Sequence, residues 1–125
     1  MRTFVVALIG LLLVACEIVP QASPLLSTAP TNPPSFTVLA AVDAKPRHGD
    51  WRTLVSGSRW VEFGTIAEGT VYKPRGTVMT VEGRNISEAY IVLHDSSWVG
   101  FWLPVEKGFV PVETTVPIRL QRGEP

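Results

Sequence analysis

The sequence predicts an all-β fold, a small β-sandwich or barrel, over residues 36–125. From Phe36 onward, short runs of β-branched and aromatic residues alternate with polar residues, and turn-forming residues separate the runs. No segment has the apolar repeat of about 3.6 residues that an amphipathic helix needs. We therefore expect roughly seven to nine short strands in one domain, in an order that the pattern leaves open.

The first expected strands are separated by polar turns. Gly57 lies in a tight turn, and Pro74 to Gly76 form another by residue type. The alanines near residue 40 also permit a short helix in place of the first strand. The strands expected in this half of the domain are 36–42, 51–56, 58–63, 70–73 and 77–82.

A hairpin of two apolar strands, 88–94 and 98–103, is the strongest tertiary signal. Residues 95–97 would form a three-residue turn between them. Side chains alternate across a strand, so both faces of this hairpin would be apolar, and it is either central or covered by something. One face would carry Ala89, Ile91, Leu93, Val99, Phe101 and Leu103, and the other Tyr90, Val92, His94, Trp98 and Trp102.

The chain finishes with two expected strands, 109–112 and 116–121. Both contain proline, which cannot donate a backbone hydrogen bond and therefore suits the edge of a sheet. Residues 16–35, in contrast, are rich in proline, serine and threonine, and predict an extended linker. At ~3.1 Å per residue such a linker would reach up to about 60 Å. A proline ligand for a partner's groove is less favoured, because no PxxP spacing with a flanking arginine is present.

An uninterrupted apolar run covers residues 4–16 and follows a short cationic start, Met1-Arg2-Thr3. A membrane-spanning helix needs ~20 apolar residues, and Glu17 ends this run earlier. The layout is typical of a cleaved secretory signal over residues 1–15. Cleavage by the common signal peptidase is the alternative, but it leaves the position of Cys16 unexplained.

Leu13-Val14-Ala15-Cys16 resembles the lipobox of bacterial lipoproteins. The resemblance implies cleavage between Ala15 and Cys16, a diacylglycerol on the Cys16 sulfur and an acyl chain such as palmitate on its amino group. Two or more chains anchor a protein stably in a membrane. Glu17, in place of an aspartate after the cysteine, implies the outer membrane and its periplasmic face. No particular lipoprotein family is identified.

Composition excludes several classes of function. The formal net charge is +0 with no basic stripe, so we expect no nucleic-acid partner. Cys16 is the single cysteine, which rules out a disulfide framework and a thiolate metal site. We expect no cofactor and no metal.

Residues with catalytic chemistry are present without the spacing that catalysis needs. His94, Asp95 and Ser96 are neighbours on one hairpin and cannot line up as a hydrolase triad. His48 and His94, with Asp50 or Asp95, lack the spacing of a zinc site. Glu62, Glu68 and Glu82 fit a solvated surface better than the carboxylate pair of a glycosidase. The sequence therefore predicts a protein that is not an enzyme, with a hydrolase as the least favoured possibility.

Four tryptophans, Trp51, Trp60, Trp98 and Trp102, can be core residues or form an exposed aromatic platform. The favoured function is a structural, assembly or interaction subunit of a larger envelope complex. It would dock onto a partner protein through a surface of Tyr90, Trp98 and Trp102. This organisation is similar to that of small lipoproteins that accompany secretion and conjugation machines. The alternative is a module that binds peptidoglycan or another glycan through exposed tryptophans.

Overall fold

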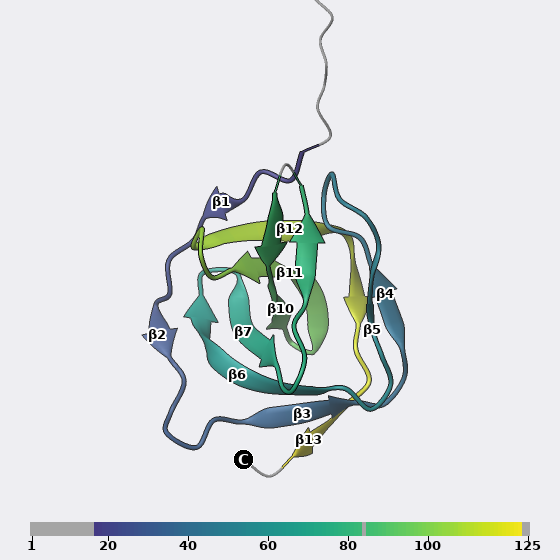
Figure 1. Cartoon of the computed structure of the whole chain (residues 1–125). Helices are drawn as coiled ribbons and strands as arrows, with labels where there is room; N and C mark the ends of the chain where they lie inside the picture. The colour runs from purple at the N-terminus through teal and green to yellow at the C-terminus, as the bar shows by residue number, and fades with distance from the viewer. Residues whose placement is uncertain (1–16, 84, 124–125) are drawn as a thin grey trace, which may run out of the picture.

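The computed structural model describes residues 17–83 and 85–123 (Figure 1). Every regular element in these residues is a β-strand and every strand pairing is antiparallel, which confirms the predicted all-β class. No helix in the described part of the chain has the length and apolar character needed to cross a membrane. The expected signal segment 1–15 and Cys16 lie outside the described residues, so processing and lipidation stay predictions.

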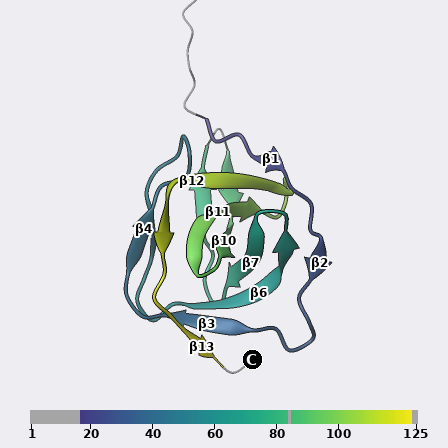
Figure 2. The ribbon, with the colours of Figure 1, turned by 180° about the vertical axis from the view of Figure 1, so that it is seen from behind.

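A nine-stranded sheet forms most of the domain, in the order β1-β12-β11-β10-β7-β6-β3-β13, with β2 paired to β6 off this path. It curls so that β12 crosses one end of the molecule while β3 and β6 cross the other (Figure 2). The strands are β1 (Gln21–Ala22), β2 (Ser27–Thr28), β3 (Ser35–Val38), β6 (Arg59–Ile66), β7 (Gly69–Pro74), β10 (Tyr90–His94), β11 (Ser97–Leu103), β12 (Gly108–Pro117) and β13 (Leu120–Gly123).

Two small sheets pack against the large one and complete the main core. They pair β4 (Val42–Ala44) with β5 (Arg52–Leu54), and β8 (Thr80–Glu82) with β9 (Ile86–Glu88). Ala44 and Leu54 from the first and Val81 from the second are fully buried in the main core. The same core takes one face of the large sheet, including Phe36, Trp60, Tyr72, Ile91, Trp98 and Phe101.

A second apolar cluster lies on the other face of the sheet. Its buried members are Ile66, Val71, Val92, Trp102 and Phe109. Successive side chains of a strand point to opposite faces of the sheet. The neighbours Phe101 and Trp102 therefore pack in different clusters, Phe101 in the main core and Trp102 in the second. Leu25, from the proline-rich segment, packs against this second cluster. The second apolar face of the hairpin is therefore covered by the protein's own N-terminal segment.

Backbone hydrogen bonds fix this N-terminal segment onto the sheet. The amide of Ser23 donates to Lys107 O (3.0 Å), that of Leu26 to Thr65 O (2.8 Å) and that of Ala29 to Phe63 O (3.1 Å). In addition, β1 pairs with β12 and β2 pairs with β6. The prediction of a free linker up to residue 35 is therefore wrong, and the domain includes residues from Glu17 onward. Proline forbids a central strand but not these two-residue edge pairings, which need few amide donors.

Gly64 shows how closely the N-terminal segment approaches β6. A Cβ atom at this position would clash with the backbone oxygen of Ser27, and it would lie 3.1 Å from Leu25 Cδ2. Only glycine allows this approach without a shift of the backbone. Gly64 thus lies inside β6, which continues to Ile66, beyond the end of the strand expected at 58–63.

The hairpin of β10 and β11 is present, with two differences from its prediction. Its turn has two residues, Asp95 and Ser96, because His94 pairs with Ser97. Both turn residues have positive φ, 49° and 62°, as a tight type I′ turn requires. The pairing also shifts register, so that Leu93 is opposite Trp98 and Val92 is opposite Gly100.

This register shift exchanges the predicted faces of Trp98 and Val99. Val99 is the extra residue of a β-bulge, and Trp98 then shares the face of Leu93 in the main core. Val99 packs instead against the second cluster. The assignment of Trp98 to the face of Trp102 is therefore wrong, since simple alternation takes no account of a bulge.

The remaining strands follow the prediction with local changes. The tight turn at Gly57 is present, but β5 pairs with β4 while β6 pairs with β3 and β7, so these neighbours do not form a hairpin. The strand predicted at 109–112 lies within the longer β12. The strand predicted at 116–121 is divided between the end of β12 at Pro117 and β13, which begins at Leu120. On the outer side of β12, β1 pairs only with Gly108 and Phe109. Beyond them an isolated bridge joins Val112 to Pro46, and Pro111 O accepts from the amide of Arg47 (2.9 Å).

Candidate functional site

The predicted interaction surface is mostly interior. Trp98 is 0% exposed and Trp102 is 2% exposed. The Trp98 indole donates to Gly100 O (3.1 Å), and the Trp102 indole donates to Ser23 O (2.8 Å). Both tryptophans are therefore core residues with satisfied N–H groups, and the prediction that they form a docking surface is wrong. Trp60 is also buried, which leaves Trp51, 63% exposed, as the only exposed indole in the described chain.

Tyr90 is the one partly exposed member of the predicted surface. Its ring packs edge-on against Phe63, with centroids 5.0 Å apart, and lies near Trp102 at 6.2 Å. Burial, together with a hydrogen bond and Coulombic repulsion from Glu88, raises the pKa of the Tyr90 phenol above its ordinary value. This residue is thus the rim of the second cluster, and its hydroxyl stays protonated at neutral pH.

The residues considered for catalysis or metal binding are dispersed over strands and turns, with Glu62 half-buried inside β6 and Glu82 exposed at the end of β8. His94 Nε2 is 3.3 Å from Asp95 Oδ2 at the tip of the β10–β11 hairpin, where both side chains are in solvent. His48, Asp50 and Glu82 line one shallow hollow, while Glu68 lines another with His48. Within residues 17–83 and 85–123, no group of three or more His, Cys, Asp or Glu side chains is arranged to hold a metal ion.

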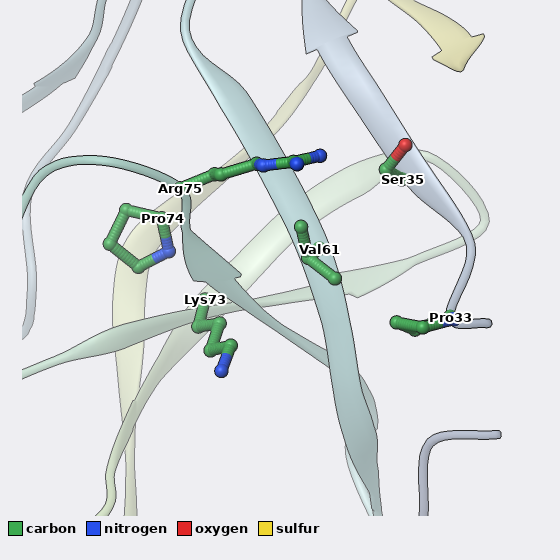
Figure 3. A pocket seen from close by; sticks show the side chains of 6 residues that line it. All are labelled: Pro33, Ser35, Val61, Lys73, Pro74 and Arg75. Atoms are coloured by element: carbon green, nitrogen blue, oxygen red, sulfur yellow. The ribbon is translucent and has the colours of Figure 1, made fainter. Parts of the chain in front are cut away.

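A hollow of about 370 Å³ opens on the outer side of β3, β6 and β7. Figure 3 shows Val61 at its centre, with Lys73, Pro74 and Arg75 on one side and Pro33 and Ser35 on the other. Strand pairing produces this arrangement, because Val61 is opposite Ser35 on β3 and opposite Lys73 on β7. The floor is apolar and the lining contains two cations and no carboxylate.

A third cation extends this surface. Arg59 precedes Val61 by two residues on β6, so its side chain leaves the same face of the strand. The amide of Arg75 donates to Arg59 O (2.9 Å), which holds these two residues side by side. All three cations, Arg59, Lys73 and Arg75, are exposed. We call this surface, with its floor at Val61, the cationic face.

The Lys73 side chain is positioned by an aromatic ring, a contact that leaves its positive charge in place. Its Nζ lies 5.9 Å from the centroid of the Phe63 ring, in a cation–π arrangement. On its other side, Lys73 borders a smaller hollow that Glu88 and Tyr90 also line. Lys73 therefore belongs to both the cationic face and the rim of the second cluster.

The cationic face and the start of the described chain lie at opposite ends of the domain. In Figure 1 the N-terminal segment enters above β12, whereas β3, β13 and the end of β7 lie at the far end. The cationic face was missed in the sequence, because its cations come from two strands separated by a turn. Comparison with protein-family models, curated proteins and solved structures found no match.

Proposed function

We propose that this protein is a bacterial lipoprotein that is anchored through Cys16 and acts as an interaction subunit of a larger envelope complex. The lipobox residues Leu13-Val14-Ala15-Cys16 support the anchor, and Glu17 favours the periplasmic face of the outer membrane. The observation that carries the interaction role is the cationic face, a hollow with an apolar floor and exposed Lys73 and Arg75.

The position of this face fits a protein held at its N-terminal end. The anchor would hold one end of the domain at the membrane, and the cationic face at the opposite end would point away from it (Figure 1). Arginine and lysine beside an apolar floor bind an acidic segment that also carries apolar side chains, since the charges orient it and the floor is desolvated. We therefore propose an envelope protein with such a segment as the partner.

Reversing two charges on the cationic face tests the interaction role. The variant Lys73→Glu/Arg75→Glu is expected to lose its envelope partner, measured by crosslinking in cells followed by affinity purification of the tagged lipoprotein. The matched control is Arg47→Glu/Lys107→Glu, which reverses two exposed charges near the other end and should retain the partner. Retention of the partner by Lys73→Glu/Arg75→Glu, or its loss to the same extent in the control, would contradict the proposal.

The anchor has its own test. Cys16→Ser is expected to abolish labelling with a radioactive fatty acid and to leave an unprocessed precursor, because signal peptidase II requires the lipid-modified cysteine. The measurement is labelling in growing cells followed by gel electrophoresis. Fatty-acid labelling that persists in the variant would exclude lipidation at Cys16.

The glycan-binding alternative required two or more exposed tryptophans around a concave surface. In the described chain this leaves Trp51 alone, and Trp51 is not among the residues that line the hollow of the cationic face. We therefore do not propose a glycan-binding role. Retention of the protein by purified sacculi, lost on Trp51→Ala, would restore it.

A further inference from the structure

We propose that the end of the domain around Ile18 rests on the lipid surface, with Val19, Ile86 and Val105 in contact with the bilayer. This inference rests on the lipid anchor of the proposed function and specifies which face of the domain meets the membrane. It also gives the domain a fixed orientation, because the cationic face then points away from the lipid.

The first observation is that the proposed anchor, Cys16, is separated from the packed part of the domain by a very short stretch of chain. Ile18 already packs against the main core. Its atoms are among the nearest that a Cβ on Gly49 would meet and are the nearest that a Cβ on Gly83 would meet, so two loops close around it. Cys16 precedes Ile18 by two residues, a distance of at most ~7 Å along an extended chain. A lipid on Cys16 would therefore hold this end of the domain directly at the bilayer.

The second step identifies what surrounds Ile18. One hollow is lined by Ile18 together with Asn85 and Ser87 of the β8–β9 hairpin and with Glu106 of the β11–β12 turn. The Ser87 hydroxyl donates to Glu106 Oε1 (3.1 Å), which links the hairpin to the turn. Figure 1 shows the N-terminal segment entering beside this hairpin and the loop between β4 and β5. These segments form one end of the molecule.

The third step concerns exposed apolar side chains at this end. Val19 is 64% exposed, Ile86 is 70% exposed and Val105 is 82% exposed. Val19 follows Ile18 directly, and Ile86 and Val105 are sequence neighbours of Ser87 and Glu106, which line one hollow with Ile18. A single exposed aliphatic residue needs no explanation, but three beside a lipid anchor add apolar contact to the membrane interface. The structure thus provides a surface that a bilayer would cover.

Charge at this end favours a zwitterionic lipid surface. Glu82 and Glu106 are exposed here together with Arg47 and Lys107, so neither sign dominates. Such side chains remain hydrated at the level of the headgroups, whereas a strongly anionic surface would repel the carboxylates. We therefore expect contact with a bilayer rich in phosphatidylethanolamine or phosphatidylcholine.

The test uses introduced cysteines in the lipidated protein. Because Cys16 is the only cysteine and its sulfur would carry the lipid, a new cysteine is the only free thiol. Ile86→Cys and Val105→Cys place an environment-sensitive nitrobenzoxadiazole label at the proposed contact. Val78→Cys is the matched control, since Val78 is 71% exposed and lines a hollow with Lys73 and Pro74 at the end of β7.

In phosphatidylcholine–phosphatidylethanolamine vesicles, labels at 86 and 105 should emit at shorter wavelength than the label at 78 and resist quenching by aqueous iodide. Flotation of the vesicles tests the lipid anchor separately from the proposed contact of residues 86 and 105 with the bilayer. Protein that fails to float and retains a free Cys16 thiol would contradict the anchor. Protein that floats, but whose labels at 86 and 105 are as accessible to iodide as the label at 78, would overturn this inference alone.

Discussion

Replacing residues 21–28 with a glycine–serine segment of equal length is expected to destabilise the domain by at least about 3 kcal/mol. The change removes Leu25 from the second cluster, where it packs beside Trp102 and Phe109. It also adds backbone freedom to the segment that pairs with β12 and β6. The measurement is the free energy of unfolding in urea, followed by tryptophan fluorescence.

The same replacement over residues 30–32 is the control. All three side chains are exposed, so the free energy of unfolding should change by no more than about 0.5 kcal/mol. If residues 21–28 were a free linker, both replacements would leave the domain equally stable. An unchanged unfolding midpoint for the 21–28 variant would therefore contradict the fold described above.

Trp98→Ala is expected to cost about 3–5 kcal/mol of unfolding free energy, the usual range for removing a large buried aromatic. Trp98 is fully buried and packs edge-on against Phe101, with ring centroids 5.2 Å apart. Its indole N–H is satisfied by Gly100 O. Because the bulge at Val99 turns Trp98 into the main core, the loss leaves a cavity between the large sheet and the small ones.

Trp51→Ala is the matched control for Trp98→Ala. Trp51 precedes β5 and is largely exposed, so its removal should change the free energy of unfolding by no more than about 0.5 kcal/mol. The measurement is thermal or urea unfolding of both variants under the same conditions. Equal losses for the two tryptophans would show that Trp98 is not the core residue described here.

The strand content was predictable because alternation of apolar and polar residues is a local property of the sequence. The hairpin of β10 and β11 is the clearest case, since its two strands lie close in sequence and only a short turn separates them. The face of Trp98 was not predictable, because the bulge depends on pairing with β10 and β12. A shift of one residue reverses which side of the sheet a side chain occupies.

The role of residues 17–35 was missed for a different reason. Proline-rich composition predicts an extended chain correctly, but it does not say whether that chain is free or packed. Leu25 and Ser23 lack the alternation of a strand, and what fixes them is the second cluster on a sheet formed by distant residues. The proline-rich segment is therefore the part of the chain that covers the aromatic face of the hairpin.

The cationic face could not be predicted from local sequence patterns either. Arg59 and Arg75 are far apart in sequence and become neighbours only when β6 pairs with β7. In contrast, Cys16 and the residues before it are recognisable by their order alone. Attachment through Cys16 is thus a prediction from residue order alone, whereas the cationic face could be found only in the structure.

Hydrogen–deuterium exchange of the purified protein tests most directly whether the N-terminal segment belongs to the domain. The amides of Ser23, Leu26 and Ala29 donate to carbonyls of the sheet, so they should exchange much more slowly than the amides of an unstructured peptide. Exchange of these three amides at the rate of an unstructured peptide, with β10 and β11 still protected, would contradict the packed segment and restore a free linker.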